Sequence, residues 1–203
     1  MFTGITQGLF PVVSIKKQTG LLTYTIQLNE LMTEQLKIGA SVAIDGVCQS
    51  VIAIKNNHQV SFQAIQETLD KTTLSCLNEQ SQVSVERSVK IGDEIGGHIV
   101  SGHVHGTAKI VDKKQTDNNL ELTFQCPREW MKYILNKGFI AVDGSSLTVV
   151  NTDANGRFSV CLIPETLKLT NFFKKNIEDN VNIELDQQTI TIVKTVERIL
   201  TKQ

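Results

Sequence analysis

The 203-residue sequence has no long apolar run and no excess of charge of either sign. No stretch approaches the roughly 18 consecutive apolar residues of a membrane-spanning helix. Lys and Arg number 20 and Asp and Glu 21, so the net charge of −1 gives no field that attracts nucleic acid or an anionic membrane. One Trp, two Tyr and eight Phe are too few for the stacking groove of an oligonucleotide-binding barrel. Neither nucleic acid nor a membrane is expected as a partner.

Cysteine and histidine are also sparse. The four cysteines form no CxxC pair, which argues against a zinc ribbon, a thioredoxin-type site and a disulfide framework. His98, His103 and His105 lie close together, but the sequence places no thiol or carboxylate to complete a metal site, so no metal is expected. The first residues lack a basic stretch and a small-residue cleavage site, which predicts a mature, cytoplasmic protein.

The sequence does contain an internal repeat. Hydrophobic residues make up 40% of the chain, enough for a packed core, and the length fits one large domain or two small ones. Similar residues recur 98 positions apart without a gap, which indicates two small domains rather than one large domain. AIDG at 43–46 returns as AVDG at 141–144, and ETL at 67–69 returns at 165–167. Single-residue matches include Gly4 with Gly102, Gly8 with Gly106, Val51 with Val149, Ser61 with Ser159, and Asn78 with Asn176.

The repeat predicts the domain organisation. The first half covers residues 1–87, a linker covers 88–96, the second half covers 97–186, and a tail covers 187–203. The tail places Val193, Val196, Ile199 and Leu200 on one helical face. That face either packs on its own barrel or forms a contact between chains.

Strand signals dominate both halves. Residues 41–54 and 139–152 each hold two β-branched runs separated by Asp-Gly, which predicts hairpins. Short helices are expected at 30–38 and 127–136, and after the ETL segments. Many short strands at close spacing predict an all-β fold with a small closed barrel in each half. The further strands are expected at 22–28, 58–65, 82–89, 120–126, 156–163 and 180–187.

The segments most alike between the halves are polar rather than uniformly apolar. Asp-Gly turns and Ser/Thr hydroxyls suit a ligand with many hydroxyls and amide-like edges, bound twice. A purely structural alternative is that Asp-Gly makes turns and ETL caps a helix. The halves differ where Ile5 corresponds to His103 and Cys48 to Ser146. A thiol and an imidazole are suited to nucleophilic and proton-transfer chemistry near neutral pH.

Several motifs together resemble the riboflavin synthase family of the trimeric, α-chain type. They are MFTGITQG, DGVC, QETL, GDEIGGHIVSGHVHG, MKYILNKGFIAVDGSSLTV, LIPETL, VNIELDQQT and TVERIL, and they span essentially the whole chain. The resemblance implies two similar six-stranded antiparallel Greek-key barrels and a C-terminal helix that gathers three chains. It implies that two molecules of 6,7-dimethyl-8-ribityllumazine exchange a four-carbon unit, giving riboflavin and 5-amino-6-(ribitylamino)uracil without a cofactor. Some family members also associate with lumazine synthase.

The resemblance also implies site residues. His103, Cys48 and Ser146 are the candidate catalytic residues, and Asp143 and Asp186 are weaker candidates. In the family the site lies between the N-terminal barrel of one subunit and the C-terminal barrel of its neighbour. The candidate substrate-binding residues are Phe2, Gly4, Ile5, Thr6, Gln49, Ser50, Gln63, Ala64, Ile65, Gln66, Glu67, Thr68, Gly102, Val104, Lys137, Leu147, Thr148, Cys161, Leu162, Ile163, Pro164, Glu165 and Thr166.

The first half departs from the family pattern. A stretch that usually reads CLTV is CQSV at 48–51, so Gln49 stands where Leu is usual, and Gln66 stands where Lys is common. We expect altered affinity in the first pocket with activity retained. The alternative is a non-catalytic, antenna-type protein that binds a lumazine or flavin. Such proteins lose the GGHxxSGH and SLTV features in their second half, and this chain keeps both.

Overall fold

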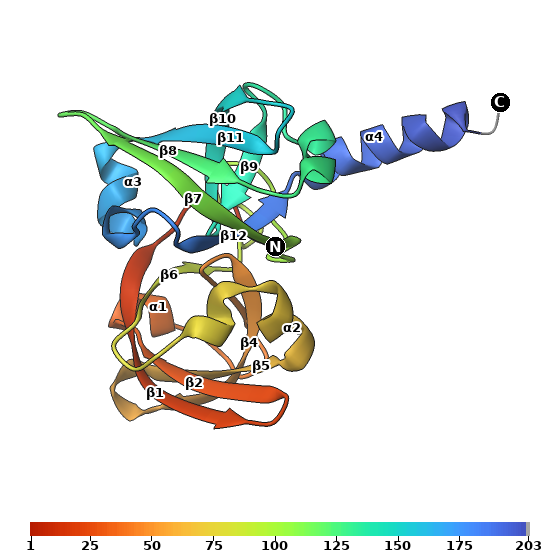
Figure 1. Ribbon diagram of the computed structural model, residues 1–203. Helices are drawn as coiled ribbons and strands as arrows, with labels where there is room; N and C mark the ends of the chain where they lie inside the picture. The colour runs from red at the N-terminus through yellow and green to blue at the C-terminus, as the bar shows by residue number, and fades with distance from the viewer. Residues whose placement is uncertain (202–203) are drawn as a thin grey trace.

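Twelve strands close into two antiparallel barrels of six strands each in the computed structural model, which describes residues 1–201 (Figure 1). The N-terminal barrel has the strand order β1-β2-β5-β4-β3-β6, and the C-terminal barrel repeats it as β7-β8-β11-β10-β9-β12. The predicted all-β class is therefore confirmed. The N-terminal strands are β1 (Gly8–Gln18), β2 (Leu21–Gln27), β3 (Ser41–Ile44), β4 (Val47–Lys55), β5 (Gln59–Ile65) and β6 (Gln82–Arg87). The C-terminal strands are β7 (Gly106–Gln115), β8 (Leu120–Gln125), β9 (Phe139–Val142), β10 (Ser145–Thr152), β11 (Arg157–Leu162) and β12 (Asn180–Leu185).

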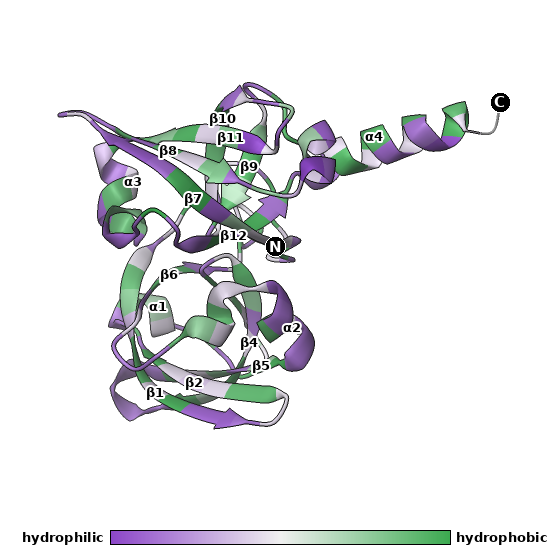
Figure 2. Ribbon diagram, in the orientation of Figure 1, coloured by the Kyte–Doolittle hydropathy of each residue, from purple (hydrophilic) through white to green (hydrophobic). Residues whose placement is uncertain are grey.

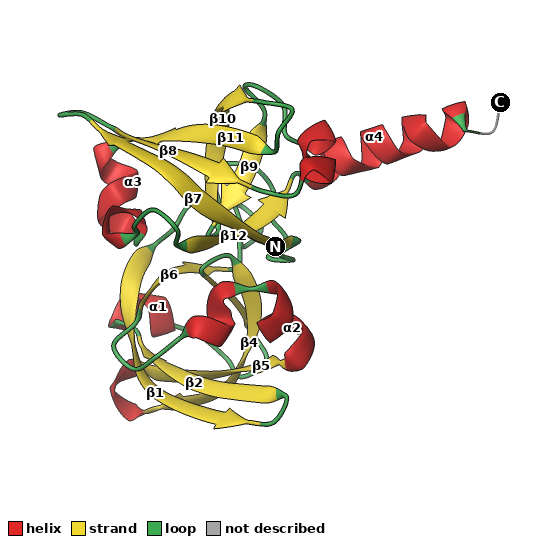
Figure 3. Ribbon diagram, in the orientation of Figure 1, coloured by secondary structure: helices red, strands yellow, loops and turns green. Residues whose placement is uncertain are grey.

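Short helices connect strands within each barrel, and a longer helix lies at the end of the described chain (Figure 3). Helix α4 projects away from the C-terminal barrel rather than folding back onto it (Figure 1). None of the helices within residues 1–201 is long and apolar enough to cross a membrane. The α-helices are α1 (Glu30–Thr33), α2 (Gln66–Lys71), α3 (Pro164–Leu169) and α4 (Gln187–Leu200), and the 3-10 helices are η1 (Asn56–His58), η2 (Thr73–Cys76), η3 (Arg128–Tyr133) and η4 (Phe172–Lys174).

The predicted short helices differ from the observed ones. The helix expected at 30–38 ends at Thr33, because Glu34 leaves the helical region with a ψ of 122° and Gln35 then adopts a left-handed φ of 53°. The one expected at 127–136 is the 3-10 helix η3, with Pro127 before it rather than in its first turn. The ETL segments lie inside α2 and α3 instead of preceding them, because each helix begins one residue before its ETL segment.

Each barrel has its own apolar core. Hydrophobic and hydrophilic residues alternate along many of the strands (Figure 2). Along β4, for example, Val47, Gln49 and Val51 are buried, while Cys48 is half-buried and Ser50 is exposed. This period of two is what a strand with one face on a core requires. It decides which of the predicted site residues face outward.

The two barrels meet through their Asp-Gly turns. Asp45 and Asp143 both adopt a φ of 43°, followed by left-handed Gly46 and Gly144. A Cβ on Gly144 would lie 2.7 Å from the Gly46 Cα, so the close approach of the two turns requires glycine. The Asp45 Oδ1 accepts hydrogen bonds from the Ser84 backbone N–H at 2.7 Å and from Asn171 Nδ2 at 3.2 Å. Asp143 instead pairs with Lys175, whose Nζ lies 3.1 Å from its Oδ2. Turn geometry therefore explains both aspartates, and the weaker catalytic candidate Asp143 is buried at this interface.

The turn interface predicts a pH dependence of folding stability. Burial, and then the nearby Asp143 carboxylate, raise the pKa of Asp45 to about 7 from an ordinary 3.8. Between pH 3.8 and about pH 7 the folded state therefore holds a proton on Asp45 that the unfolded chain releases. As pH rises through this range, Asp45 lowers the free energy of unfolding, by at most about 1.4 kcal/mol per pH unit. Asp45→Asn keeps an oxygen for the Ser84 N–H and should flatten this slope in denaturant unfolding measured between about pH 5 and pH 8.

The contrasting variant is Asp143→Asn. It removes the carboxylate that pairs with the largely buried Lys175 and should lower stability at every pH in that range. If the free energy of unfolding changed with pH equally in wild type and in Asp45→Asn, the assignment of the pH dependence to Asp45 would be wrong.

Candidate functional site

Two neighbouring strands part in each barrel at the same repeat position. The pairing of β4 with β5 ends at Val51 and Phe62, although β4 begins at Val47 and β5 continues to Ile65. In the second barrel the pairing of β10 with β11 ends at Val149 and Val160. We call these openings the N-seam, between residues 48–50 and 63–65, and the C-seam, between residues 146–148 and 161–163.

The seams present backbone as well as side-chain polar groups. The Val51 N–H and C=O bond to Ala40 and Gly39, on the β3 side of β4. Because backbone groups alternate direction along a strand, the N–H and C=O of Ser50 face the N-seam. Val149 bonds in the same way to Gly138 and Lys137, so the backbone of Thr148 faces the C-seam. Each seam therefore offers a donor, an acceptor and a hydroxyl to a ligand with amide-like edges.

Two extended segments cross between the barrels. Strap 1 is residues 2–6 and strap 2 is residues 100–104. They pair with each other through an antiparallel bridge at Phe2 and Val100. The Gly4 C=O then accepts from the Ser146 N–H at 2.8 Å, and the Gly102 C=O accepts from the Cys48 N–H at 2.9 Å. Each strap thus lies against the seam of the other barrel, and strap 2 brings exposed His103 to the seam that carries Cys48.

The predicted site residues divide into outward-facing and core-facing groups. Cys48, Ser146 and the exposed Ser50 and Thr148 lie along the seams, and the exposed residues of β5, β11 and the following helices lie across from them. Those opposite residues are Gln63, Ile65, Gln66, Glu67, Cys161, Ile163, Pro164 and Glu165, with half-buried Thr68 and Thr166.

The side chains of a second group point into the cores. Gln49, Ala64, Leu147 and Leu162 are buried, so only their backbones can meet a ligand. Phe2 is fully buried in a small cluster between the barrels, with Val100, Ala43 and Ala141, and is not available to stack on a ring in this chain.

Lys137, Asp186 and the histidines take separate positions. Lys137 is exposed near the C-seam, where its charge opposes the burial that raises the pKa of Cys161. Asp186 caps α4, accepting at Oδ2 from the Thr189 N–H at 2.8 Å. The Nδ1 of His105 accepts from the Leu185 N–H at 3.2 Å.

Sequence reasoning missed His98 as a neighbour of the site. Its Nδ1 shares a hydrogen bond of 2.6 Å with the Ser146 Oγ, and its ring stacks on Phe139 at 5.1 Å between centroids. Burial lowers the pKa of His98, which favours the neutral imidazole. The repeat offered no signal, because the corresponding position before strap 1 lies outside the sequence.

Gln49, the departure from the expected Leu, has a partner inside the N-terminal barrel. The Tyr24 hydroxyl donates to its Oε1 at 3.2 Å, and its Nε2 donates to the Cys48 C=O at 3.0 Å. At the corresponding positions the C-terminal barrel has buried Leu122 and Leu147. The polar pair therefore replaces an apolar pair and satisfies its own hydrogen bonds.

Breaking this pair should destabilise the protein more than replacing it whole. Gln49→Leu leaves the fully buried Tyr24 hydroxyl without an acceptor, and we expect a loss of about 1–3 kcal/mol in the free energy of unfolding. The double variant Tyr24→Leu with Gln49→Leu copies the second barrel and should recover part of that loss. A double-mutant cycle by urea unfolding measures the coupling. Strictly additive losses would contradict the pairing.

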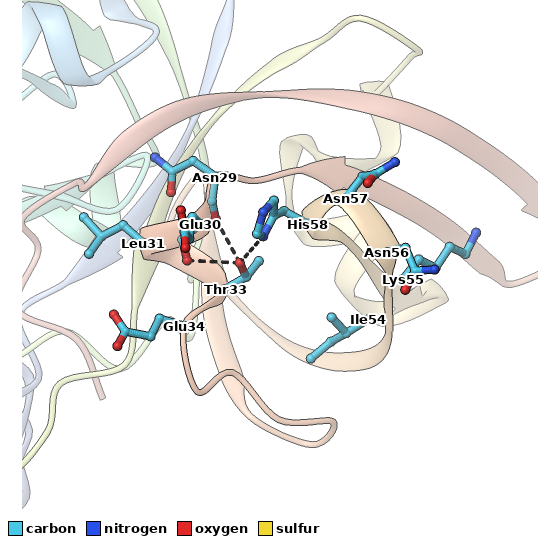
Figure 4. Close-up of a pocket in the computed structure, with 10 residues that line it drawn as sticks. All are labelled: Asn29, Glu30, Leu31, Thr33, Glu34, Ile54, Lys55, Asn56, Asn57 and His58. Atoms are coloured by element: carbon cyan, nitrogen blue, oxygen red, sulfur yellow. Dashed lines mark hydrogen bonds between the residues drawn. The ribbon is translucent and has the colours of Figure 1, made fainter.

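Three surface depressions lie apart from the two seams. The first, of about 900 Å³, is at the far end of the N-terminal barrel, where the His58 Nδ1 and the Thr33 Oγ1 lie 2.6 Å apart (Figure 4). The second, of about 840 Å³, lies beside strap 1, and the third, of about 570 Å³, lies between the barrels near Asp45. None of the three is lined by Cys48, Ser50 or His103.

Comparison with known proteins gives two consistent results. A family model described as "Lumazine binding domain" matches residues 3–88 and again residues 101–186. The chain is 46% identical over 201 residues to riboflavin synthase of Escherichia coli (strain K12), covering 98% of this chain and 93% of the relative. It is 44% identical to the riboflavin synthase of Chlamydia pneumoniae, covering 98% and 97%. Its fold is similar to that of LumP complexed with riboflavin, with a TM-score of 0.85 at 21% identity, covering 92% of this chain and all of that one.

Proposed function

Because the chain belongs to the riboflavin synthase family and is an enzyme of that type, we propose that each of its two seams binds one molecule of 6,7-dimethyl-8-ribityllumazine. The observation that carries this is the duplicated seam: two equivalent slots in one chain suit a reaction between two copies of one substrate. The polar backbone of Ser50 and Thr148 would meet the amide-like edge of each pteridine. The exposed hydroxyls and carboxamides nearby suit the ribityl chains.

The reaction is a dismutation that needs no external oxidant or reductant. One lumazine gives up a four-carbon unit and becomes 5-amino-6-(ribitylamino)uracil, and the other gains it and becomes riboflavin. One substrate is reduced in effect while the other is oxidised, so the electrons balance between them. The main contribution of the protein is then to hold two rings in reacting geometry, which is worth up to roughly 7–11 kcal/mol in favourable cases.

The asymmetry between the seams suggests the residue roles. The 7-methyl group of the lumazine is acidic, because its carbanion is delocalised into the ring, and His103 is our candidate to move that proton. Cys48 and Ser146 would orient the rings or assist addition at C7 of the other lumazine. The crossing of the straps supports these roles. Because strap 2 lies against the N-terminal barrel, the His103 residue comes to the same seam as the Cys48 thiol.

A trimer completes this account. Of the four residues expected on one face of the tail, Val193 packs against the core of the C-terminal barrel. Val196, Ile199 and Leu200 are exposed along one side of helix α4, together with Ile192. An apolar face of this kind on a projecting helix suits contact with other copies of the chain. We therefore propose a homotrimer in which the N-seam of one subunit faces the C-seam of its neighbour. Association with lumazine synthase would involve the outside of this assembly.

A cytoplasmic location also stays a proposal. It is supported by the four cysteines, which are free in the part of the chain that the structure describes. We expect no nucleic acid or membrane among the partners.

Incubation with the lumazine alone tests the proposed function. The purified protein, without metal or cofactor, should produce riboflavin and the aminouracil in equal amounts over many turnovers, followed by absorbance and fluorescence. Binding without turnover would show instead the non-catalytic, antenna-type protein.

A further inference from the structure

Each strap is held by a buried glutamate from the last strand of its own barrel. Glu86, in β6, accepts hydrogen bonds from the Thr3 N–H at 2.7 Å, the Thr3 hydroxyl at 2.9 Å and the Gly4 N–H at 3.2 Å. Glu184, in β12, accepts from the Ser101 N–H at 2.7 Å, the Ser101 hydroxyl at 2.7 Å and the Gly102 N–H at 2.8 Å. The two carboxylates are related by the 98-residue offset and make the same three contacts.

The held glycines pass this restraint to the opposite barrel. Gly4 and Gly102 adopt left-handed φ values of 74° and 80°. Their carbonyls accept from the backbone N–H of Ser146 and of Cys48. A Cβ on Gly102 would lie 2.6 Å from the Cys48 Cβ, so the strap and the seam are in direct contact. Glu184 is thus connected to the N-seam through strap 2, and Glu86 is connected to the C-seam through strap 1.

Only a carboxylate can make all three contacts at once. Both oxygens of each glutamate accept, and no ion pair involves either of them within residues 1–201. Charge-assisted bonds from backbone N–H groups are strong and directional. A glutamine side chain has only one accepting oxygen. Its amide N–H₂ would therefore face either the backbone N–H of the glycine or the backbone N–H of Thr3 or Ser101. The strap would have to shift to avoid this contact between donors.

We propose that Glu184 and Glu86 are positioning residues, each of which fixes the reactive side chain of the opposite barrel through a glycine carbonyl. Glu184 sets the position of Cys48 and the direction of His103, which follows Gly102 in strap 2. Glu86 sets Ser146 in the same way through strap 1. Neither half of the repeat can then arrange its own seam alone, and the two seams are coupled within one chain. The naming of Cys48 and Ser146 as reactive groups rests on the proposed function, but the coupling itself does not.

Thiol alkylation tests this crossed relation without requiring turnover. In the full-length protein, iodoacetamide modification of Cys48 is followed by peptide mass spectrometry, with exposed Cys76, in η2 and outside both seams, as the internal reference. Glu184→Gln should change the rate at Cys48 several-fold and leave the rate at Cys76 unchanged, and Glu86→Gln should leave both rates unchanged. In a Cys48→Ser, Ser146→Cys background the relation should reverse, so that E86Q changes the rate at position 146 and E184Q does not.

Kinetics adds a second readout. E184Q should lower kcat about tenfold or more with little change in KM, because misplacing a reacting group by about 1 Å affects the chemical step most. If the glutamine variants do not fold, Ser101→Ala and Thr3→Ala each remove one of the three donors and should give the same crossed pattern with smaller changes, while Ser101→Thr keeps the hydroxyl and the wild-type rate. Equal effects of both glutamates on Cys48, or none, would overturn the proposal.

Discussion

Replacing His103 by Gln should lower kcat by roughly 100-fold or more, the range expected when a positioned proton-transfer group is lost. Glutamine keeps hydrogen-bonding capacity at the end of strap 2 but cannot take up a proton near neutral pH. His103 is exposed at the N-seam, and the backbone of strap 2 is held by Gly102 and Glu184 rather than by the imidazole. Lumazine affinity, measured by fluorescence titration, should therefore change little.

His58→Gln is the matched control for this variant. His58 lies at the far end of the same barrel, beside Thr33 (Figure 4). The same substitution there should leave kcat at the wild-type value. If His103→Gln turned over as fast as wild type, the proton-transfer role would be wrong, while the binding roles of the seams would stand.

Placing a charge on the exposed side of α4 should also lower the activity, for a different reason. Ile192 is 65% exposed and Ile199 is 58% exposed in the single chain. In the proposed trimer, glutamate at both positions would bury two unpaired charges in a helix contact, so we expect that trimer to dissociate. The activity should fall at least tenfold, because reacting groups would no longer be held together. Light scattering gives the mass, and the same samples give the rate.

Lys194→Glu is the control for the α4 variant, because residue 194 lies on the opposite side of the helix from residue 192. It should remain trimeric and active. A dissociated double variant with full activity would show that each chain assembles a complete site by itself.

The 98-residue offset predicted the two barrels, but it could not predict the strap exchange. A repeat says which residues correspond, for example Gly4 and Gly102, and it does not say which barrel each one contacts. That choice depends on how the Asp-Gly turns pack at the interface, where Gly46 meets Gly144. Only the structure showed that His103 lies at the seam of Cys48.

Local patterns explain the other differences. Strands β1 and β7 were not identified from the sequence. Bulges between Val12 and Ser14 and between Ile110 and Asp112 interrupt their alternation, and polar and charged residues predominate in their second halves. The burial of Gln49 could have been predicted, because it alternates with the outward-facing Cys48 and Ser50. Its partner Tyr24 could not, since their contact joins residues 25 positions apart across the barrel interior.

An isotope-mixing measurement tests most directly the central claim that two copies of one substrate react together. Equal amounts of unlabelled lumazine and lumazine labelled with carbon-13 in both ring carbons 6 and 7 and their methyl groups are incubated with the protein. Mass spectrometry then separates riboflavin with no label, with four labelled carbons and with eight. Joining of two molecules by four-carbon transfer predicts that the four-labelled species is as abundant as the other two together. Riboflavin without that mixed species, or no riboflavin at all, would contradict the account.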